Sequence, residues 1–320
     1  MRVTPSSRPR GDLRPVDCSI SFFLRFGSRY AAQDARFMRA SLHRTLDWMA
    51  HAQMATRSKM GSPHRSRLLY NGAIIDAHNH IGMDLEGVTQ LPQSLLRKME
   101  QSHVQKCIIF PFNEIKPGKA FSTANDYIAK VVAAHPEKFI GFARTDPQHP
   151  LAVDEVQRAV KQLGLKGLKL HPRSQLFNPS DEQTLPLLEA CVGLHVPILF
   201  HSGYAYDPIP PMIAQVAQSF PELSIIMGHM GCSEVCTPTG VEEAIQVARS
   251  NDNVYLETSR VMLASCIAKA VQVIGDTRVL FGSDTPYGSQ LDEIATILRA
   301  GLSETSLSRV FSENIKELLR

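Results

Sequence analysis

One pattern dominates the chain from Ala73 to its C-terminal end. A short β-branched or apolar run is followed by a loop and then by an amphipathic stretch, and this unit repeats eight times. The alternation is typical of βα units in a parallel sheet. The expected strands are Ala73–His78, Lys106–Phe112, Phe139–Ala143, Gly167–His171, Pro197–His201, Ser224–His229, Val254–Thr258 and Arg278–Gly282.

Helices are expected after each of these strands. Their predicted ranges are Leu91–Ser102, Ala124–Ala134, Leu151–Leu163, Glu182–Leu194, Pro211–Phe220, Gly240–Ser250, Met262–Ile274 and Gln290–Ala300, with a last outer helix at Glu304–Leu319. Eight βα units predict an α/β fold that closes into a single-domain (β/α)₈ TIM barrel. The main rival is an open doubly wound sheet, which usually carries a Gly-rich phosphate turn after an early strand. Neither GxGxxG nor a Walker sequence occurs here, so the barrel is preferred.

The N-terminal part of the chain has a different composition. Residues 1–60 hold eleven Lys and Arg against four Asp, and no Glu occurs before Glu86. Three interpretations are open: a targeting segment such as a mitochondrial presequence, a disordered or loosely helical extension, and upstream sequence from a start codon placed too early. The last is favoured because Met60 stands close to the start of the regular pattern. We therefore expect an N-terminal extension over residues 1–70 and a barrel domain over residues 71–320.

Composition bounds the size of the fold and its partners. The 320 residues are 43% hydrophobic and 20% charged, which is enough to bury the core of one barrel. No Lys/Arg block occurs, so we expect no nucleic-acid partner. The apolar runs are far shorter than the roughly 20 residues that a membrane span needs. We expect a cytoplasmic protein that binds a small molecule and is a possible homodimer, or a mitochondrial one if residues 1–60 are a presequence.

Six cysteines are scattered along the chain at positions 18, 107, 191, 232, 236 and 266. This scatter fits reduced thiols better than a disulfide framework. Cys232 and Cys236 could share a helix face near His229. Their interpretation as small core residues is nevertheless preferred to metal binding.

Polar side chains of metal-binding type follow several of the expected strands. They are His78 and His80 after the first strand, His171 after the fourth, His201 after the fifth, His229 after the sixth and Asp284 after the eighth. In a barrel, the carboxyl ends of all strands meet at one face, where active sites lie. A lone histidine is usually a solvated or satisfied side chain, but the same placement on successive strands predicts convergence on one site.

The pair His78-x-His80 has the spacing of two ligands to one metal ion. Side chains alternate along a strand with a period of two, so both imidazoles leave the first strand on the same side. Imidazole suits Zn²⁺, and three nitrogens with one carboxylate would leave room for a catalytic water. Mn²⁺, Fe²⁺ or Ni²⁺ would also fit, because ligand type alone does not select among them.

Five motifs carry a resemblance to a known family. They are DAHNH at 76–80, GLKLHP at 167–172, PILFHSG at 197–203, IIMGHMG at 225–231 and LFGSDTPYG at 280–288. Together these motifs resemble the amidohydrolase-2 branch of the amidohydrolase superfamily, over about residues 73–318. The resemblance implies that His78, His80, His201 and Asp284 bind one divalent metal ion and that His229 is a catalytic or substrate-polarising group. The superfamily also includes nonoxidative decarboxylases similar to aminocarboxymuconate-semialdehyde decarboxylase.

Further residues near the strand ends could bind substrate. Lys169 precedes His171 by two and should face the same side, where it would pair with a carboxylate or a substrate anion. In other branches of the superfamily a lysine on this strand is carboxylated and bridges two metals, but one metal is favoured here. A guanidinium at the mouth would suit a substrate carboxylate. The expected substrate-binding residues are Lys169, His171, Arg144, Arg173, Arg260 and Tyr204.

The resulting prediction is a metal-dependent hydrolase that cleaves an ester, lactone or amide bond of a small, carboxylate-bearing molecule. The metal would lower the pKa of a bound water, Asp284 would accept its proton, and His229 would stabilise the oxyanion. The alternatives are a nonoxidative decarboxylase with the same mononuclear site and a noncatalytic metal-binding barrel. A serine hydrolase is disfavoured because Ser283 lacks the GxSxG frame.

We predict that a chain that begins at Met60 keeps its fold and its metal. The reason is that the first strand opens near Ala73, and nothing earlier completes the barrel pattern. Soluble yield, circular dichroism and metal content relative to the full chain provide the measurement. Loss of soluble protein would show that residues 1–60 stabilise the barrel.

Overall fold

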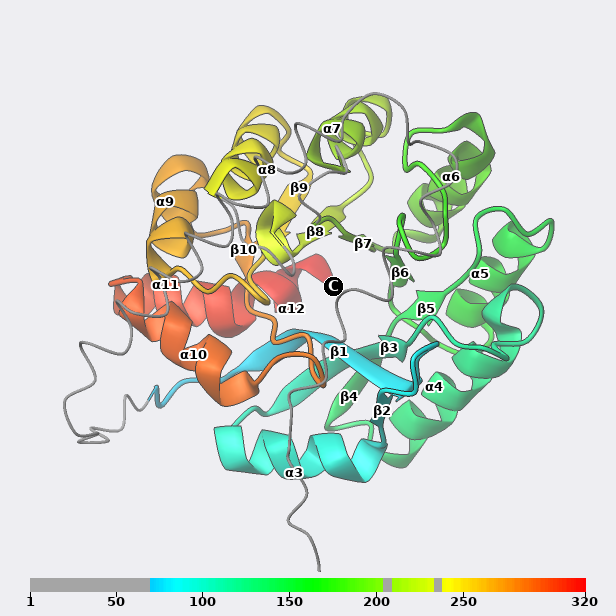
Figure 1. Cartoon of the computed structure of the whole chain (residues 1–320), viewed down its shortest axis with the longest axis horizontal. Coiled ribbons are helices and arrows are strands. Elements are labelled where there is room, and N and C mark those ends of the chain that lie inside the picture. The colour runs from blue at the N-terminus through cyan, green and yellow to red at the C-terminus, as the bar shows by residue number, and fades with distance from the viewer. Residues whose placement is uncertain (1–69, 204–208, 233–237) are drawn as a thin grey trace, which may run out of the picture. The chain divides into compact units, whose positions relative to one another are not determined.

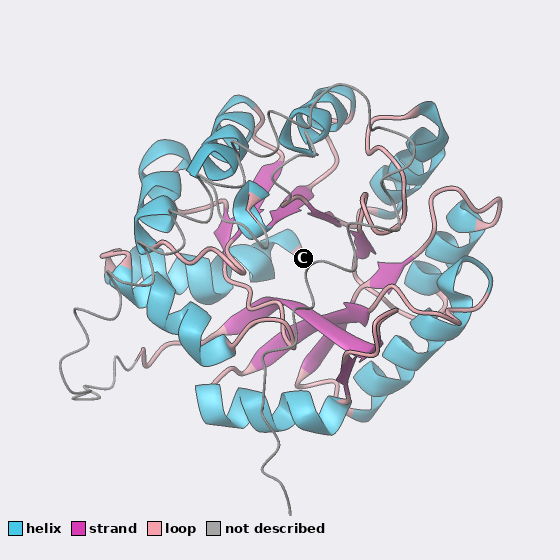
Figure 2. Ribbon diagram, viewed as in Figure 1, coloured by secondary structure: helices cyan, strands magenta, loops and turns pink. Residues whose placement is uncertain are grey.

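Short apolar runs form a ring of strands, and amphipathic segments form helices outside it (Figure 1). The structure is a computed structural model that describes residues 70–203, 209–232 and 238–320. Figure 2 shows the strands inside and the helices around them. The strands are β1 (Ile75–Met83), β2 (Thr89–Gln90), β3 (Lys106–Pro111), β4 (Phe139–Gly141), β5 (Ala143–Arg144), β6 (Leu168–Leu170), β7 (Ile198–His201), β8 (Ile225–Gly228), β9 (Val254–Glu257) and β10 (Val279–Leu280).

The helices follow the strands as the sequence pattern predicts. They are α3 (Pro92–Ser102), α4 (Ser122–Ala134), α5 (Ala152–Lys161), α6 (Leu185–Leu194), α7 (Ile209–Ser219), α8 (Pro238–Ser250), α9 (Ala264–Ile274), α10 (Gln290–Arg299), α11 (Glu304–Ser308) and α12 (Asn314–Leu318). Short 3₁₀ turns are η1 (Lys119–Phe121), η2 (Glu182–Thr184) and η3 (His229–Gly231). The expected last helix is divided, because the π-helical segment η4 (Arg309–Glu313) separates α11 from α12.

Parallel pairing joins the strands in two sheets, β1-β3-β4 and β10-β9-β8-β7-β6-β5, with β2 antiparallel at the edge of β1. The third expected strand is shared between the sheets. Its first part, β4, pairs with β3, and its second part, β5, pairs with β6. Phe142 lies between the two parts and donates its backbone N–H to Ile109 O at 2.9 Å. The eight expected strand positions are therefore occupied within the described residues.

The first strand also bonds to the segment that follows the last strand. Ala77 N donates to Phe281 O at 2.9 Å, Asp284 N to His78 O at 2.8 Å, and His80 N to Thr285 O at 2.9 Å. We call this contact the β1–β10 seam. Because it links the two sheets, the strands form a continuous ring, and the α/β barrel fold class is confirmed.

Two apolar layers fill the fold. One contains helix residues such as Leu95 and Val156 together with strand residues such as Ile109, and it lies between the ring and the helices. The other takes alternate strand residues, including Phe110 and Leu199, and fills the interior of the ring. The period of two along each strand produces this division.

The described helices include none that is both long enough and apolar enough to cross a membrane. Cys107, Cys191 and Cys266 are free thiols, whereas Cys232 is disulfide-bonded. The expectation of reduced thiols throughout is therefore wrong at Cys232. Spacing along a sequence does not show which thiols the fold brings within bonding distance.

A buried carboxylate stabilises the β1–β10 seam. Asp76 on β1 accepts hydrogen bonds from Ser283 N at 2.9 Å and Ser283 Oγ at 2.6 Å. It also accepts one from Gln290 Nε2 at 2.8 Å and one from His78 N at 3.2 Å. Burial raises the pKa of Asp76 to about 6, although these hydrogen bonds oppose the shift. The carboxylate thus ties β1 to the residue that directly precedes Asp284.

We predict that Asp76→Ala lowers the free energy of unfolding by about 2–4 kcal/mol, because it removes the carboxylate that accepts from the buried donors of Ser283 and Gln290. Asp76→Asn retains one acceptor oxygen and should cost less. Urea unfolding followed by circular dichroism gives the comparison. Equal midpoints for the wild type and the alanine variant would mean that the seam does not depend on this carboxylate.

Candidate metal centre and active site

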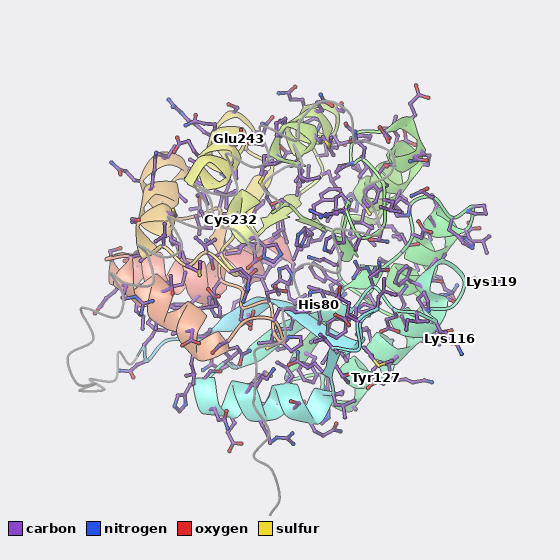
Figure 3. All side chains as sticks on the ribbon, viewed as in Figure 1. His80, Lys116, Lys119, Tyr127, Cys232 and Glu243 are labelled. Carbon is purple, nitrogen blue, oxygen red and sulfur yellow. The ribbon has the colours of Figure 1, made fainter. Side chains whose placement is uncertain are left out.

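The expected metal-binding side chains gather at the carboxyl ends of the strands. His78 and His80 lie on β1, Asp284 follows β10, His201 ends β7, and His229 begins η3 directly after β8. Figure 3 shows His80 near the middle of the ring. The sequence prediction that these strand ends converge therefore agrees with the geometry.

Three of these side chains form a compact ligand group. The Nε2 atoms of His78 and His80 lie 3.4 Å and 3.2 Å from Oδ1 of Asp284. The three ligand atoms lie within 4.8 Å of one another. All three side chains are almost completely buried. Two imidazole nitrogens and one carboxylate oxygen at this spacing fit a single divalent cation.

Glu257, the last residue of β9, holds the other nitrogen of His78. Its Oε2 lies 2.7 Å from His78 Nδ1, and its carboxylate also accepts from Ser259 N at 2.6 Å and Ser259 Oγ at 2.8 Å. A carboxylate on the far nitrogen of a ligand imidazole fixes its tautomer and raises its basicity. Gly282 allows this approach, because a Cβ there would collide with the Glu257 carboxylate.

The remaining histidines form a chain beside the ligand group. His229 Nε2 lies 3.0 Å from His201 Nδ1, and the His201 ring stacks on the His171 ring with centroids 3.8 Å apart. His229 Nδ1 lies 2.8 Å from Ser259 Oγ. Within the described residues, His201 belongs to neither compact ligand group, whereas His229 forms one with His78 and Glu257. The role of His201 as the third imidazole ligand remains a prediction.

Burial keeps the site histidines in their metal-binding form. Desolvation lowers the pKa of His78, His80, His171 and His201, and it lowers that of His229 to about 3. Neutral imidazoles can bind a cation without first losing a proton. Burial alone would raise the pKa of Asp284, but His78 and the hydrogen bond with His80 hold it well below its usual range. The group therefore offers neutral nitrogens and an ionised carboxylate.

Lys169 on β6 reaches the same group. Its Nζ lies 3.1 Å from His78 Nε2 and 5.2 Å from the centre of the Phe110 ring. Burial lowers the pKa of this ammonium to about 7, while the Asp284 charge opposes the shift. An amine that loses its proton near neutrality is chemically able to take up CO₂, so the carboxylated-lysine alternative stays open alongside the single-metal prediction.

The three candidate arginines differ in position. Arg144 on β5 is buried, whereas Arg173 lies exposed in the loop after β6. Arg260 donates from Nη1 to Tyr287 O at 2.7 Å, so a backbone carbonyl already holds its guanidinium. Tyr204 lies outside the described residues. Of the three candidate arginines, Arg144 is therefore the one whose side chain is buried within the barrel.

The backbone is strained at several of the site residues. Asp284, His229 and Arg260 have φ values of 57°, 65° and 63°, in the left-handed region that non-glycine residues seldom adopt. Such conformations persist where surrounding contacts impose them, and they cluster at functional sites. The strain on Asp284 and His229 is an observation independent of their residue types.

Sequence reasoning missed Glu257 and Ser259. Glu257 closes the apolar run Val254–Glu257 and occupies the same strand-end position as the selected histidines. An acidic residue directly after a buried run was therefore a usable signal. Its partner His78 lies 179 positions away, and only the ring brings the two together.

Comparisons with known proteins agree with this geometry. The sequence model of a family described as amidohydrolase matches residues 75–320. The chain is 27% identical over 245 residues to gamma-resorcylate decarboxylase of Polaromonas sp., which covers 62% of this chain and 75% of that protein. It is 31% identical over 242 residues to 2-amino-3-carboxymuconate-6-semialdehyde decarboxylase of Dictyostelium discoideum, covering 64% of this chain and 66% of that protein.

Solved structures with the same fold include two decarboxylases. The 5-carboxyvanillate decarboxylase of Sphingomonas paucimobilis has a TM-score of 0.62 at 17% identity and covers 78% of this chain and 99% of that chain. Dihydroxybenzoic acid decarboxylase of Polaromonas sp., solved with bound manganese and the inhibitor 2-nitroresorcinol, has a TM-score of 0.59 at 19% identity. It covers 78% of this chain and 97% of that chain. At these identities the likeness establishes the fold alone.

We predict that Glu257→Gln weakens metal binding about 10–100-fold while the fold is retained, because the His78 imidazole loses its anionic partner. The purified wild type should hold about one divalent ion per chain, and His78→Ala should lose most of it. Metal content by mass spectrometry and competition with a chelator provide the measurements. His103→Asn, at an exposed helix end, is the control.

A Glu257→Gln variant with wild-type metal affinity would contradict the positioning role. Two ions per chain in the wild type would instead support a carboxylated Lys169 that bridges two metals.

Proposed function

The chain belongs to the amidohydrolase family and is an enzyme of hydrolase or decarboxylase type, and from this premise we propose that it is a metal-dependent decarboxylase of a small aromatic carboxylic acid. One observation carries the proposal. The buried group of His78, His80 and Asp284 lies in a chain whose relatives of stated activity are decarboxylases. Decarboxylation, the alternative stated in the sequence analysis, is therefore better supported than hydrolysis, which was the first expectation.

The donor set fits a divalent metal ion held by His78, His80 and Asp284, with His201 as a further ligand. Mn²⁺ is the first ion to test, because a solved relative of the same fold contains manganese. Zn²⁺ suits the same imidazole and carboxylate donors. The ion, when bound, would act as a Lewis acid on a substrate oxygen.

The chain's own residues supply the proton transfer. Asp284 is ionised at neutral pH, so it can accept a proton from an acidic group of the substrate and deliver it to the carbon that bears the carboxylate. The bond between that carbon and the carboxylate carbon then breaks. Its electron pair returns to the ring, and CO₂ leaves. His229 lies 2.8 Å from Ser259 Oγ through its Nδ1, and burial lowers its pKa to about 3, so it would act as a neutral hydrogen-bond partner of the substrate.

Hydrolysis of an ester, lactone or amide is the second candidate. It would use the same carboxylate as the acceptor of a proton from water, so the arrangement of residues serves both reactions. Among the named relatives, decarboxylases favour the first candidate. A noncatalytic barrel has no support among these relatives, which are enzymes.

We predict that the Mn²⁺-loaded protein releases CO₂ from at least one hydroxylated benzoate, with 2,6-dihydroxybenzoate as the first compound to test. Asp284→Asn keeps the side-chain size but removes its basicity, so kcat should fall by about 10²–10⁴-fold with the circular dichroism spectrum unchanged. Asp154→Asn, on the exposed face of α5, is the matched control.

A parallel screen with esters and lactones separates the two candidates. Turnover of an ester or lactone without CO₂ release from any acid would replace decarboxylation by hydrolysis. Near-normal turnover in Asp284→Asn would overturn the assigned proton transfer in either reaction.

A further inference from the structure

Arg144 is a buried guanidinium whose backbone is fixed at one position. Its side chain is 1% exposed. Its backbone N–H donates to Asn125 Oδ1 at 2.9 Å, and its carbonyl accepts from Asn125 Nδ2 at 2.9 Å. These two bonds tie the end of β5 to α4, so the direction in which the Arg144 side chain leaves the strand is defined.

That direction is the interior of the ring. Arg144 pairs with Lys169 in the parallel ladder between β5 and β6, and paired residues direct their side chains to the same face of a sheet. The Lys169 ammonium reaches His78 in the ligand group. Phe142, two residues before Arg144, packs in the interior apolar layer. Arg144 therefore enters the barrel from the same side as the proposed metal ligands.

One edge of the guanidinium has no acceptor. Nη1 donates to Pro111 O at 3.0 Å, and the Phe121 ring lies 5.7 Å from the guanidinium carbon. Nε and Nη2 have no hydrogen-bond partner among the described residues. These two nitrogens form the side edge of the guanidinium, with parallel N–H bonds spaced for the two oxygens of one carboxylate.

The unsatisfied edge also carries a full charge. Burial lowers the pKa of Arg144 only to about 9, so the group is cationic at neutral pH. Its charge lowers the pKa of His171 and His80, which places it within electrostatic reach of the site. A buried cation with unused donors is costly unless an anion compensates it. Glu114 lies near enough to interact electrostatically but makes no hydrogen bond to Arg144.

The reacting carboxylate is a poor candidate for this anion. As CO₂ forms, the departing group loses its negative charge, so two charge-assisted hydrogen bonds would stabilise the ground state more than the transition state. A group that keeps its charge throughout the reaction has no such conflict. The edge of Arg144 thus fits an anion that remains on the product.

We infer that Arg144 binds a second carboxylate of the substrate, one that is retained in the product, through two parallel hydrogen bonds from Nε and Nη2. This inference rests on the proposed decarboxylase function and narrows its substrate class to dicarboxylic acids. Lys169 and Asp284 then face the reacting part of the molecule, and Arg144 fixes its orientation.

Equilibrium binding tests the inference without turnover. Benzoate and its three dicarboxylic counterparts, phthalate, isophthalate and terephthalate, are titrated into the Mn²⁺-loaded protein by calorimetry. At least one dicarboxylate should bind about 10–100-fold more tightly than benzoate, as expected for a charge-assisted pair of hydrogen bonds. Arg144→Lys keeps the positive charge but lacks the two parallel N–H donors, and Arg144→Gln lacks both the charge and these donors. Both variants should lose most of the preference.

Two controls separate recognition from stability. Arg158→Lys makes the same change in an arginine paired with Glu155 on α5, and it should leave the preference unchanged. Glu114→Gln removes the nearby carboxylate and should leave the preference intact. Melting temperatures identify any unfolded variant, and Arg144→Lys decides the outcome if Arg144→Gln does not fold.

Equal affinity for benzoate and every dicarboxylate, or a preference that survives in Arg144→Lys, would overturn the inference. The decarboxylation assay is independent of this result. CO₂ release without a dicarboxylate preference would leave the proposed function standing and remove the inference. A preference for dicarboxylates that depends on Arg144, without CO₂ release from any acid, would support the binding role of Arg144 and remove the proposed decarboxylase function.

Discussion

The β1–β10 seam is the contact on which the rest of the site depends. His78 and His80 come from the first strand and Asp284 from the segment after the last, so the ligand group exists only when these segments pair. The backbone bond from Asp284 N to His78 O sets the distance between the two segments directly. Asp76 on β1 stabilises the same seam by accepting two hydrogen bonds from Ser283, the residue before Asp284. The residues that hold the seam together are thus adjacent to the proposed metal ligands in both segments.

Burial gives the site its chemical character. Desolvation lowers the pKa of the histidines, whereas the interactions of Asp284 with His78 and with the N–H of His80 hold the pKa of this carboxyl below its usual range. Two basic side chains, Lys169 and Arg144, enter the same interior from neighbouring strands. An anionic substrate would therefore meet buried side chains, among which each hydrogen bond and each charge acts more strongly than in water. The strained backbone of Asp284 is maintained by the seam that holds it.

The sequence predicted most of the fold because the relevant signals are local. Apolar runs and amphipathic stretches gave strands and helices close to those observed, and strand-end positions gave His78, His80 and Asp284. The shared third strand and the antiparallel β2 were not predicted, since both depend on pairing between strands. Glu257 was missed for the same reason, because its role is defined by a contact with β1. The reaction was not fixed by residue types, since the same donors serve hydrolysis and decarboxylation.

The position of the seam has a consequence for how the protein matures. The first two proposed ligands leave the ribosome early, but Asp284 is made about 200 residues later. A nascent chain therefore carries a pair of histidines without their carboxylate for almost the whole of barrel synthesis. The hydrogen bond between Glu257 and His78 also cannot form before β9 has been made. The complete ligand group can therefore form only after the segment that follows β10 has been made, and a chain that ends before Asp284 would lack its carboxylate.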